Sequence, residues 1–208
     1  ALNYSAFLFI VDDPNAIDKG LKHATSIYGV QDQETKPQGN TYNFLVLPQV
    51  REQIKELKLV KDPGLLTRPD GLKFNDLKPI SATVWVYYPW RNTLVHCLNK
   101  EDFKFLRISR NQNIITKNEQ KKFEKIRVGV AGLNVGNPGA VCLALEGDIK
   151  MKLADNDVLS LSNLNRFRAG LPDLGLNKAV LSARQIWEIN TFAELEVFDK
   201  GISRDNIE

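Results

Sequence analysis

The chain has 208 residues, of which 43% are hydrophobic and 25% are charged, and its formal net charge is +3. This is ordinary globular composition, and the length suits one large domain or two small ones. No apolar run approaches the roughly 20 residues of a membrane-spanning helix, and the first residues do not resemble a secretory signal. Lys and Arg are interleaved with Asp and Glu, which favours a solvated surface over a nucleic-acid patch.

The two cysteines indicate a reducing compartment. Cys97 and Cys142 both lie in apolar contexts, and no pair of cysteines has metal-ligand spacing. We therefore expect each cysteine to be a small core residue and expect no metal-ligating side chains. We also expect a cytoplasmic location, without membrane or nucleic-acid partners.

The first half of the chain predicts a small α+β domain. A short apolar strand is followed by a helix with helical apolar spacing, a polar loop, a second apolar stretch, a helix that begins near Pro48, and an irregular, turn-rich segment. These elements cover, in order, residues 6–11, 16–28, 31–40, 43–47, 48–57 and 62–80.

A β-hairpin follows, and the pattern then changes. The β-branched and aromatic residues 83–88 and the apolar residues 93–98 flank a Pro-Trp-Arg-Asn turn, and residues 101–108 favour a third strand. Thr116 with Glu119 three residues later predicts a capped helix over 117–125. Strand–helix alternation begins there, so we expect one domain over residues 1–110 and another over 111–208.

The second domain begins with the pattern of a nucleotide-binding βαβ unit. A buried parallel strand is expected at 126–131, a glycine-containing turn at 132–139, a helix at 140–146 that ends at Gly147, and a second strand at 149–154. The second strand runs directly into acidic residues, the first of which is Asp155.

Glycines and an acid at this spacing suit a nucleotide. Gly132 and Gly136 let the backbone turn so that a phosphate can approach the amides and the positive dipole end of the helix. Asp155 lies 19 positions after Gly136, close to the roughly 20 typical of a ribose-binding carboxylate. Asn134 stands where a second glycine of the usual fingerprint would be. The alternative is a plain βαβ crossover whose glycines serve only packing.

Further polar residues follow the acidic turn. Asn163 and Arg166 belong to Leu-Ser-Asn-Leu-Asn-Arg, and Lys178 begins a helix that leads to a third strand at 194–198. Connections near the carboxyl ends of parallel strands are where open α/β sheets bind ligands. An arginine and a lysine there can neutralise the charge of a triphosphate.

Residues 107–208 resemble the ThiF/MoeB family, relatives of the ubiquitin-activating enzymes. The resemblance rests on Ala154-Asp155-Asn156-Asp157, on Ser162 to Arg166, on Gly175-x-x-Lys178 and on Ile189-Asn190. It implies a Rossmann-like parallel sheet, of which this chain holds the first half, and an ATP site. The implied cofactor-binding residues are Gly132, Asn134, Gly136, Asp155, Asp157 and Asn163, and the implied catalytic residues are Arg166, Lys178 and Arg110.

The resemblance also implies an activity and partners. The family uses ATP and magnesium to adenylate a carboxylate, usually the C-terminus of a ubiquitin-like or sulfur-carrier protein. It works as a dimer in which the second arginine of an Arg-x-x-Arg segment, here Arg110, reaches the ATP of the partner. Phe167 replaces the usual Gln, and the family's magnesium-binding Asp would follow a fourth strand that lies beyond this sequence.

Residues 85–120 also resemble the leading part of large bacterial proteins that place a ThiF-like domain before a nitroreductase-like domain. We therefore expect this chain to be the N-terminal portion of a longer protein. A sheet that stops at its third strand would also leave an apolar edge and an apolar face exposed.

Three hypotheses follow for function. The first is ATP-dependent adenylation, the second is a nucleotide-binding or dimerisation module that has lost its chemistry, and the third is an NAD- or FAD-binding part of an oxidoreductase. The first domain contains no catalytic constellation: His23 and His96 are expected to be structural, and the aromatic residues at 85–90 suit the core of a hairpin better than a binding platform.

Overall fold

The structure is a computed structural model that describes residues 9–11, 45–67, 83–147, 150–204 and 206. The chain separates into two compact units, one within residues 6–107 and the other within residues 108–208. The helix expected at 16–28, the loop at 31–40 and most of the irregular segment before residue 83 lie outside the described residues.

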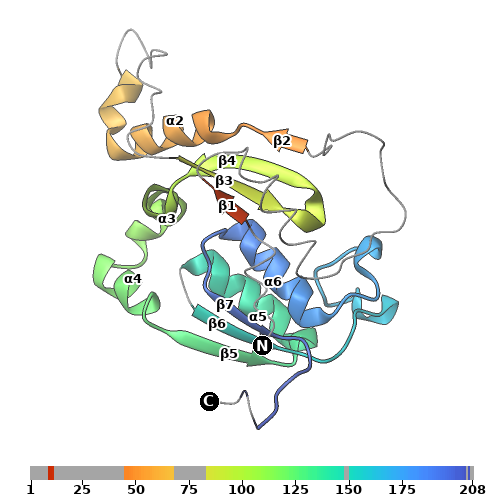
Figure 1. The fold of residues 1–208 in the computed structure, drawn as a ribbon. Coiled ribbons are helices and arrows are strands. Elements are labelled where there is room, and N and C mark those ends of the chain that lie inside the picture. Colours follow the sequence, from red (N-terminus) through yellow and green to blue (C-terminus); the bar gives the residue numbers. More distant parts are fainter. Residues whose placement is uncertain (1–8, 12–44, 68–82, 148–149, 205, 207–208) are drawn as a thin grey trace, which may run out of the picture. The chain divides into compact units, whose positions relative to one another are not determined.

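The first unit contains a four-stranded sheet in the order β1-β3-β4-β2 (Figure 1). The predicted hairpin is confirmed, with β3 paired antiparallel to β4 from Thr83↔Leu98 to Tyr88↔Thr93. Asn92 closes the turn with a φ of 46°, a left-handed conformation that Asn tolerates well. The strands are β1 (Phe9–Val11), β2 (Leu45–Leu47), β3 (Thr83–Tyr88) and β4 (Thr93–Leu98).

Helix α2 (Val50–Lys61) buries Val50, Ile54 and Leu57 in a cluster with Leu98 of β4. A short 3₁₀ helix, η2 (Pro63–Thr67), follows it. These buried residues recur at helical spacing, which is why the sequence predicted this helix correctly.

The third strand expected at 101–108 is wrong, because this segment forms helix α3 (Lys100–Arg107). Asn99 accepts a hydrogen bond from the Asp102 amide at 3.0 Å, which is an N-cap interaction. Lys61 of α2 pairs with Asp102 at 2.8 Å. The overlooked signal is an Asn followed three residues later by an acid, which is typical of a helix start.

The second unit is the Rossmann-like half that the sequence predicted. Its three strands are all parallel, in the order β5-β6-β7, and helices α5 and α6 connect them. Helix α4 precedes them and begins at the predicted Thr116–Glu119 capping box. The elements are η5 (Ser109–Asn113), α4 (Lys117–Phe123), β5 (Arg127–Ala131), α5 (Leu133–Glu146), β6 (Lys150–Ala154), η6 (Leu161–Asn163), η7 (Leu171–Asp173), α6 (Lys178–Ile189) and β7 (Leu195–Phe198).

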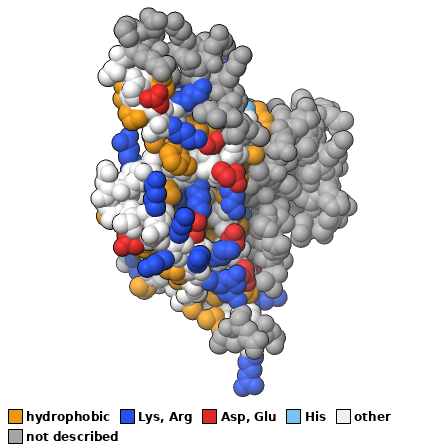
Figure 2. Space-filling view, turned by 90° about the vertical axis from the view of Figure 1, so that its left-hand side faces the viewer, with side chains coloured by type: hydrophobic (Ala, Val, Ile, Leu, Met, Phe, Trp, Pro, Cys, Tyr) orange, Lys and Arg blue, Asp and Glu red, His pale blue; other side chains and the backbone are white. Residues whose placement is uncertain are grey.

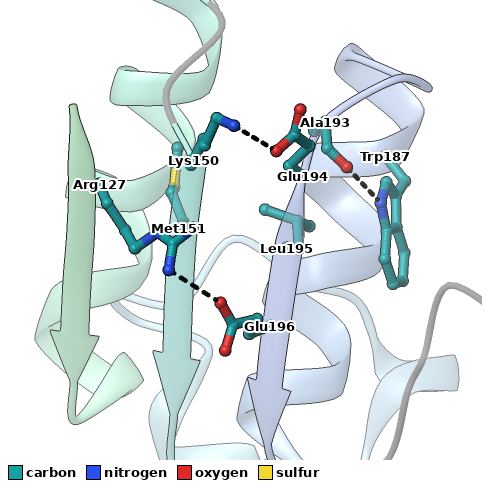
Figure 3. Close-up of a pocket in the computed structure, with 8 residues that line it drawn as sticks. All are labelled: Arg127, Lys150, Met151, Trp187, Ala193, Glu194, Leu195 and Glu196. Atoms are coloured by element: carbon teal, nitrogen blue, oxygen red, sulfur yellow. Dashed lines mark hydrogen bonds and ion pairs between the residues drawn. The ribbon is translucent and has the colours of Figure 1, made fainter. Parts of the chain in front are cut away.

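This parallel sheet has one apolar face and one charged face. Met151, Leu153 and Val197 are buried on the side that α5 and α6 cover. Alternate residues point the other way, and charges there recur two apart, at Lys150 and Lys152 in β6 and at Glu194 and Glu196 at the start of β7. Two cross-strand ion pairs are drawn in Figure 3, Lys150 with Glu194 at 2.7 Å and Arg127 with Glu196 at 3.6 Å. Lys152 also pairs with Glu196, at 3.7 Å.

Two expectations about this sheet were therefore wrong. The face that no described helix of this unit covers is charged rather than apolar, since Lys-x-Lys and Glu-x-Glu place charges on one side of a strand. Strand β5, expected to be buried, alternates between exposed and half-buried residues. Its outer edge pairs with no described strand, so it lacks the second neighbour of an interior strand.

The described surface carries both signs of charge. On the face shown in Figure 2, Lys and Arg side chains lie among Asp, Glu and apolar side chains. Among the described helices, none combines the length and the hydropathy needed to cross a membrane.

Candidate functional site

Helix α5 begins immediately after the first glycine of the predicted turn. Gly132 has a φ of 80° and space around its Cα, and Leu133 is already helical. The helix expected from Ala140 is therefore seven residues longer at its start. Pro138 lies inside this helix and cannot donate a hydrogen bond to the carbonyl four residues earlier.

Gly136 is required by the packing of α5 against β5. A Cβ at this position would lie 2.6 Å from Cγ1 of Val130 in β5, so only glycine lets α5 approach the strand this closely. The packing alternative raised for the glycines thus applies to Gly136. It does not apply to Gly132, where no atom would crowd a Cβ and the positive φ itself favours glycine.

The carboxylate of Asp155 lies at the start of α5. It accepts hydrogen bonds from the amide of Leu133 at 2.6 Å and from the amide of Asp157 at 2.8 Å. Asp155 is buried, with 8% of its surface exposed. The end of β6 is thereby tied to the turn after β5, as the predicted juxtaposition of glycine turn and acid requires.

Two amides in the first turn of α5 remain available. Within the described chain, the N–H groups of Asn134 and Val135 form no hydrogen bond, as expected for the opening turn of a helix without a side-chain cap. The Oδ1 atom of Asn134 is buried and also lacks a partner among the described residues. Free amides at the positive end of a 14-residue helix form a site for an anion.

A buried lysine lies on the same edge of the sheet. The side chain of Lys178, at the first position of α6, is 4% exposed, and its Nζ lies 3.1 Å from Oδ2 of Asp157. The positive end of a helix disfavours a cation, and burial adds a desolvation cost. Asp157, whose side chain is 69% exposed, offsets both and remains open to solvent.

Asn177, which the sequence analysis did not assign a role, links these groups. Its Oδ1 accepts from the amides of Ala179 and Val180 and so caps α6. Its Nδ2 donates to the carbonyl oxygens of Asp155, Asp157 and Asp199. The available signal was an Asn directly before a predicted helix.

The connection between β6 and α6 is held by its own small core. Leu159, Phe167 and Leu181 are buried together, with Leu164, Ala169 and Leu176 around them. Phe167, which departs from the family pattern, is only 2% exposed and anchors the loop.

Asn163 and Arg166 are bonded within this same loop. Oδ1 of Asn163 accepts from the Ser160 amide at 3.0 Å, a local cap. Arg166 is exposed and donates to Oδ1 of Asn165 at 2.7 Å. The structure thus brings Gly132, Asn134, Asp155, Asp157 and Lys178 together at one edge of the sheet, whereas the side chains of Asn163 and Arg166 bond to groups of their own loop.

Comparison with known proteins places the second unit in a family. The family model described as the ThiF family matches residues 108–208.

Residues 108–208 form a ThiF family domain.

Relatives of the ThiF domain include two curated proteins. An uncharacterized protein MT1398 of Mycobacterium tuberculosis is 39% identical over 145 residues, which cover 69% of this chain and 20% of that protein. A probable molybdopterin-synthase adenylyltransferase of Porphyra purpurea is 35% identical over 80 residues, which cover 38% of this chain and 20% of that protein. The chain thus spans about a fifth of the length of the curated relatives it matches.

The structure is also similar to that of a solved relative. The tRNA N6-threonylcarbamoyladenosine dehydratase TcdA of E. coli matches with a TM-score of 0.48 at 28% identity, over 50% of this chain and 45% of that one. The 145 residues aligned with the mycobacterial protein exceed the stretch matched by the ThiF model, so that similarity extends upstream of residue 108.

Other candidate groups lie elsewhere in the ThiF domain or in the first unit. Arg110 belongs to η5 and is exposed, with no recorded contact to the groups around Asp155. Cys142 is exposed on α5, so the expectation of a core cysteine is wrong there and right for buried Cys97. Among the described residues, no three His, Cys, Asp or Glu side chains cluster as metal ligands.

Cys97 and His96 are placed as structural groups. Burial raises the pKa of the Cys97 thiol to about 12, which keeps it protonated and unreactive. His96 stacks on Trp85 with ring centroids 4.1 Å apart, and its Nε2 lies 2.8 Å from Oγ1 of Thr83. Burial lowers the pKa of His96, so the neutral ring is favoured in the fold.

Proposed function

We propose that the ThiF domain binds ATP at the start of α5 and that the whole protein uses it to adenylate a carboxylate. The observation that supports this most is the pairing of free amides with a buried acid. Asn134 and Val135 offer their N–H groups to phosphate, and the Asp155 carboxylate lies within 2.6 Å of the adjoining Leu133 amide. A nucleotide needs both, an anion site for phosphates and a carboxylate for ribose hydroxyls.

The cations have separate roles in this proposal. Lys178 provides a buried positive charge that a phosphate can share with Asp157. Among the described residues, exposed Arg166 donates only to Ser162 and Asn165 of its own loop, so its side chain is free to turn toward the phosphates. Charges of this kind stabilise the transition state when a carboxylate oxygen attacks the α-phosphorus and pyrophosphate leaves.

We propose that this chain provides only some of the ligands of a magnesium ion. The described residues provide Asp155 and Asp157 but no third ligand nearby. Magnesium commonly binds through one or two carboxylates together with the phosphates of its substrate. Phosphate oxygens and water would then complete its coordination.

The proposed acyl substrate is the C-terminus of a ubiquitin-like or sulfur-carrier protein. The similarity to a probable molybdopterin-synthase adenylyltransferase supports a small-protein partner. We also propose that two copies associate, with exposed Arg110 of one reaching the nucleotide of the other. A Cys nucleophile for a later thioester step is absent from the site, since Cys97 is buried in the first unit and Cys142 lies on α5.

ATP–pyrophosphate exchange with the full-length protein tests the activity. Exchange that saturates with ATP and the acyl partner, and that falls at least about tenfold in Arg166→Ala, supports adenylation. Nucleotide affinity without exchange would instead identify a binding or dimerisation module. Binding of NAD or FAD with no affinity for ATP would identify an oxidoreductase part.

The proposal that the chain is the leading part of a longer protein is supported by the free edge of β5. The backbone amide of Lys150 donates to the carbonyl of Ile126, and the backbone amide of Gly132 donates to the carbonyl of Ala154. The even-numbered residues of β5 therefore bond to β6. In a parallel ladder the alternate residues then direct both backbone groups outward. Among the described residues, nothing pairs with the outward backbone groups of Arg127, Gly129 and Ala131, so a further strand could bond to them.

A further inference from the structure

The side chain of Asn177 is placed where three parts of the ThiF domain meet. It follows the Gly175 turn and is the N-cap of α6. Its amide nitrogen lies 2.9 Å from the carbonyl of Asp155, 3.2 Å from that of Asp157 and 3.0 Å from that of Asp199. These carbonyls belong to the segments that leave β6 and β7, so one side chain joins both strand ends to the helix.

The orientation of this amide follows from its neighbours. Oδ1 faces two N–H groups, those of Ala179 at 2.9 Å and Val180 at 3.1 Å, whereas Nδ2 faces only carbonyl oxygens. The reversed amide would set donor against donor and acceptor against acceptor. A hydroxyl or carboxylate could cap α6 equally well, but neither has an NH₂ group to donate to the carbonyls.

The carbonyls that Asn177 holds belong to the residues that form the proposed site. The backbone of Asp155 determines where its carboxylate meets the amides of Leu133 and Asp157. The backbone carbonyl of Asp157 also accepts from the Lys178 amide at 3.0 Å, and its side chain meets the Lys178 ammonium. A shift at either residue would move the acid away from the start of α5.

We propose that Asn177 is the positioning residue of the nucleotide site, an inference that rests on the proposed function of that site. It sets the Asp155 carboxylate and the Asp157–Lys178 pair relative to the free amides of α5, and it does so through its NH₂ group rather than through its capping oxygen. It touches neither nucleotide nor acyl substrate.

The variant Asn177→Asp separates these two roles. Aspartate keeps the capping oxygen but places a carboxylate oxygen against three carbonyls. Asn177→Ser, which also keeps a capping oxygen but adds no charge, is the milder second variant. Asn111→Asp is the matched control, because Asn111 donates to the Glu146 carbonyl at 3.0 Å at the opposite end of α5.

Amide hydrogen exchange by NMR on the 208-residue chain is the first measurement. In Asn177→Asp the amides of Leu133 and Asp157 should exchange about tenfold faster or more, while those of Ala179 and Val180 keep their wild-type rates. Asn177→Ser should give a smaller change of the same pattern, and Asn111→Asp should leave Leu133 unchanged. Unaltered exchange at Leu133 in both Asn177 variants would overturn the proposal.

Titration with ATP is the second measurement and separates this inference from the proposed function. The expected result is a Kd about tenfold higher or more in Asn177→Asp and unchanged in Asn111→Asp. Faster exchange at Leu133 with an unaltered Kd would overturn the role of Asn177 while the ATP site stands. A wild-type chain with no affinity for ATP would refute the proposed function, and the exchange data alone would then decide whether Asn177 holds Asp155.

Discussion

At the scale of single residues, Lys178 carries the clearest conflict between stability and function. Its ammonium is almost completely buried at the positive end of α6, and its recorded partner is the mostly exposed Asp157. Replacing a buried ion pair by apolar side chains is often neutral or stabilising, and removing only Lys178 leaves no buried charge behind because the Asp157 side chain is 69% exposed. A lysine buried at such a place is better explained by a ligand than by the fold.

Lys178→Met is therefore expected to weaken ATP binding without lowering the stability of the fold. The melting temperature should stay within a few degrees or rise, whereas ATP should bind about tenfold to a hundredfold more weakly because a charge-assisted contact is worth about 1.5–3 kcal/mol. Calorimetric titration and thermal melting of the same preparation measure both. An equal affinity in the variant would remove Lys178 from the site, and Lys122→Met on α4 is the control for loss of a surface charge.

The sequence predicts most readily the position of residues whose chemistry is local. Gly132 requires a positive φ, and Asp155 follows a strand at the spacing of a ribose-binding acid, so both were predictable. Asn177 was not identified because three of its partners lie on segments far away in the chain. Likewise, the contact that reserves Gly136 for packing involves Val130 in the neighbouring strand.

At the scale of elements, the fit of α5 against β5 controls the geometry of the anion site. The helix approaches the strand at Gly136, and its first turn presents the free amides. Gly139 lies one turn later in the same helix, and a Cβ there would meet nothing within 4 Å. The two glycines therefore form a matched pair.

Gly136→Ala and Gly139→Ala should change the free energy of unfolding in opposite directions. The first should destabilise the ThiF domain by about 1–3 kcal/mol because the new methyl group overlaps Val130. The second should stabilise it by up to about 1 kcal/mol because alanine is the better helix former. Urea unfolding measures both, and a destabilised Gly139→Ala with an unaffected Gly136→Ala would contradict the described packing.

Helices and strands are predicted correctly where a hydrophobic pattern extends over many residues. They are predicted less well where a single capping residue distinguishes a helix from a strand. The strands at 83–88 and 93–98 and the helix after Asn177 follow their patterns. Helix α3 was mistaken for a strand because its cap at Asn99 was overlooked. Helix α5 begins seven residues before the predicted start, although Pro138 removes one of its hydrogen bonds and crowds the preceding turn.

At the scale of the whole molecule, the ThiF domain has a polar face and an open edge. The charged side chains on the uncovered face satisfy one another by ion pairs across the strands. The outer edge of β5 pairs with no described strand, and its residues Gly129 and Ala131 are small and exposed. An unprotected edge of this kind is a template for a further strand.

Amide exchange in β5 tests the proposed continuation of the sheet. In the 208-residue chain, the amides of Val128 and Val130 should be protected by β6, whereas those of Gly129 and Ala131 should exchange quickly. In the longer protein all four should be protected. If Gly129 and Ala131 remain fast in the longer protein, no strand is added at this edge, and Val128 and Val130 provide the internal control.

The most direct test of the nucleotide site is an ATP titration of the isotopically labelled chain, followed through its backbone amide resonances. The amides of Asn134 and Val135 should show the largest shifts, with Leu133 beside them, and the same shifts should require a higher ATP concentration in Lys178→Met. Unmoved Asn134 and Val135 resonances at saturating ATP, or shifts confined to residues away from the start of α5, would contradict the account.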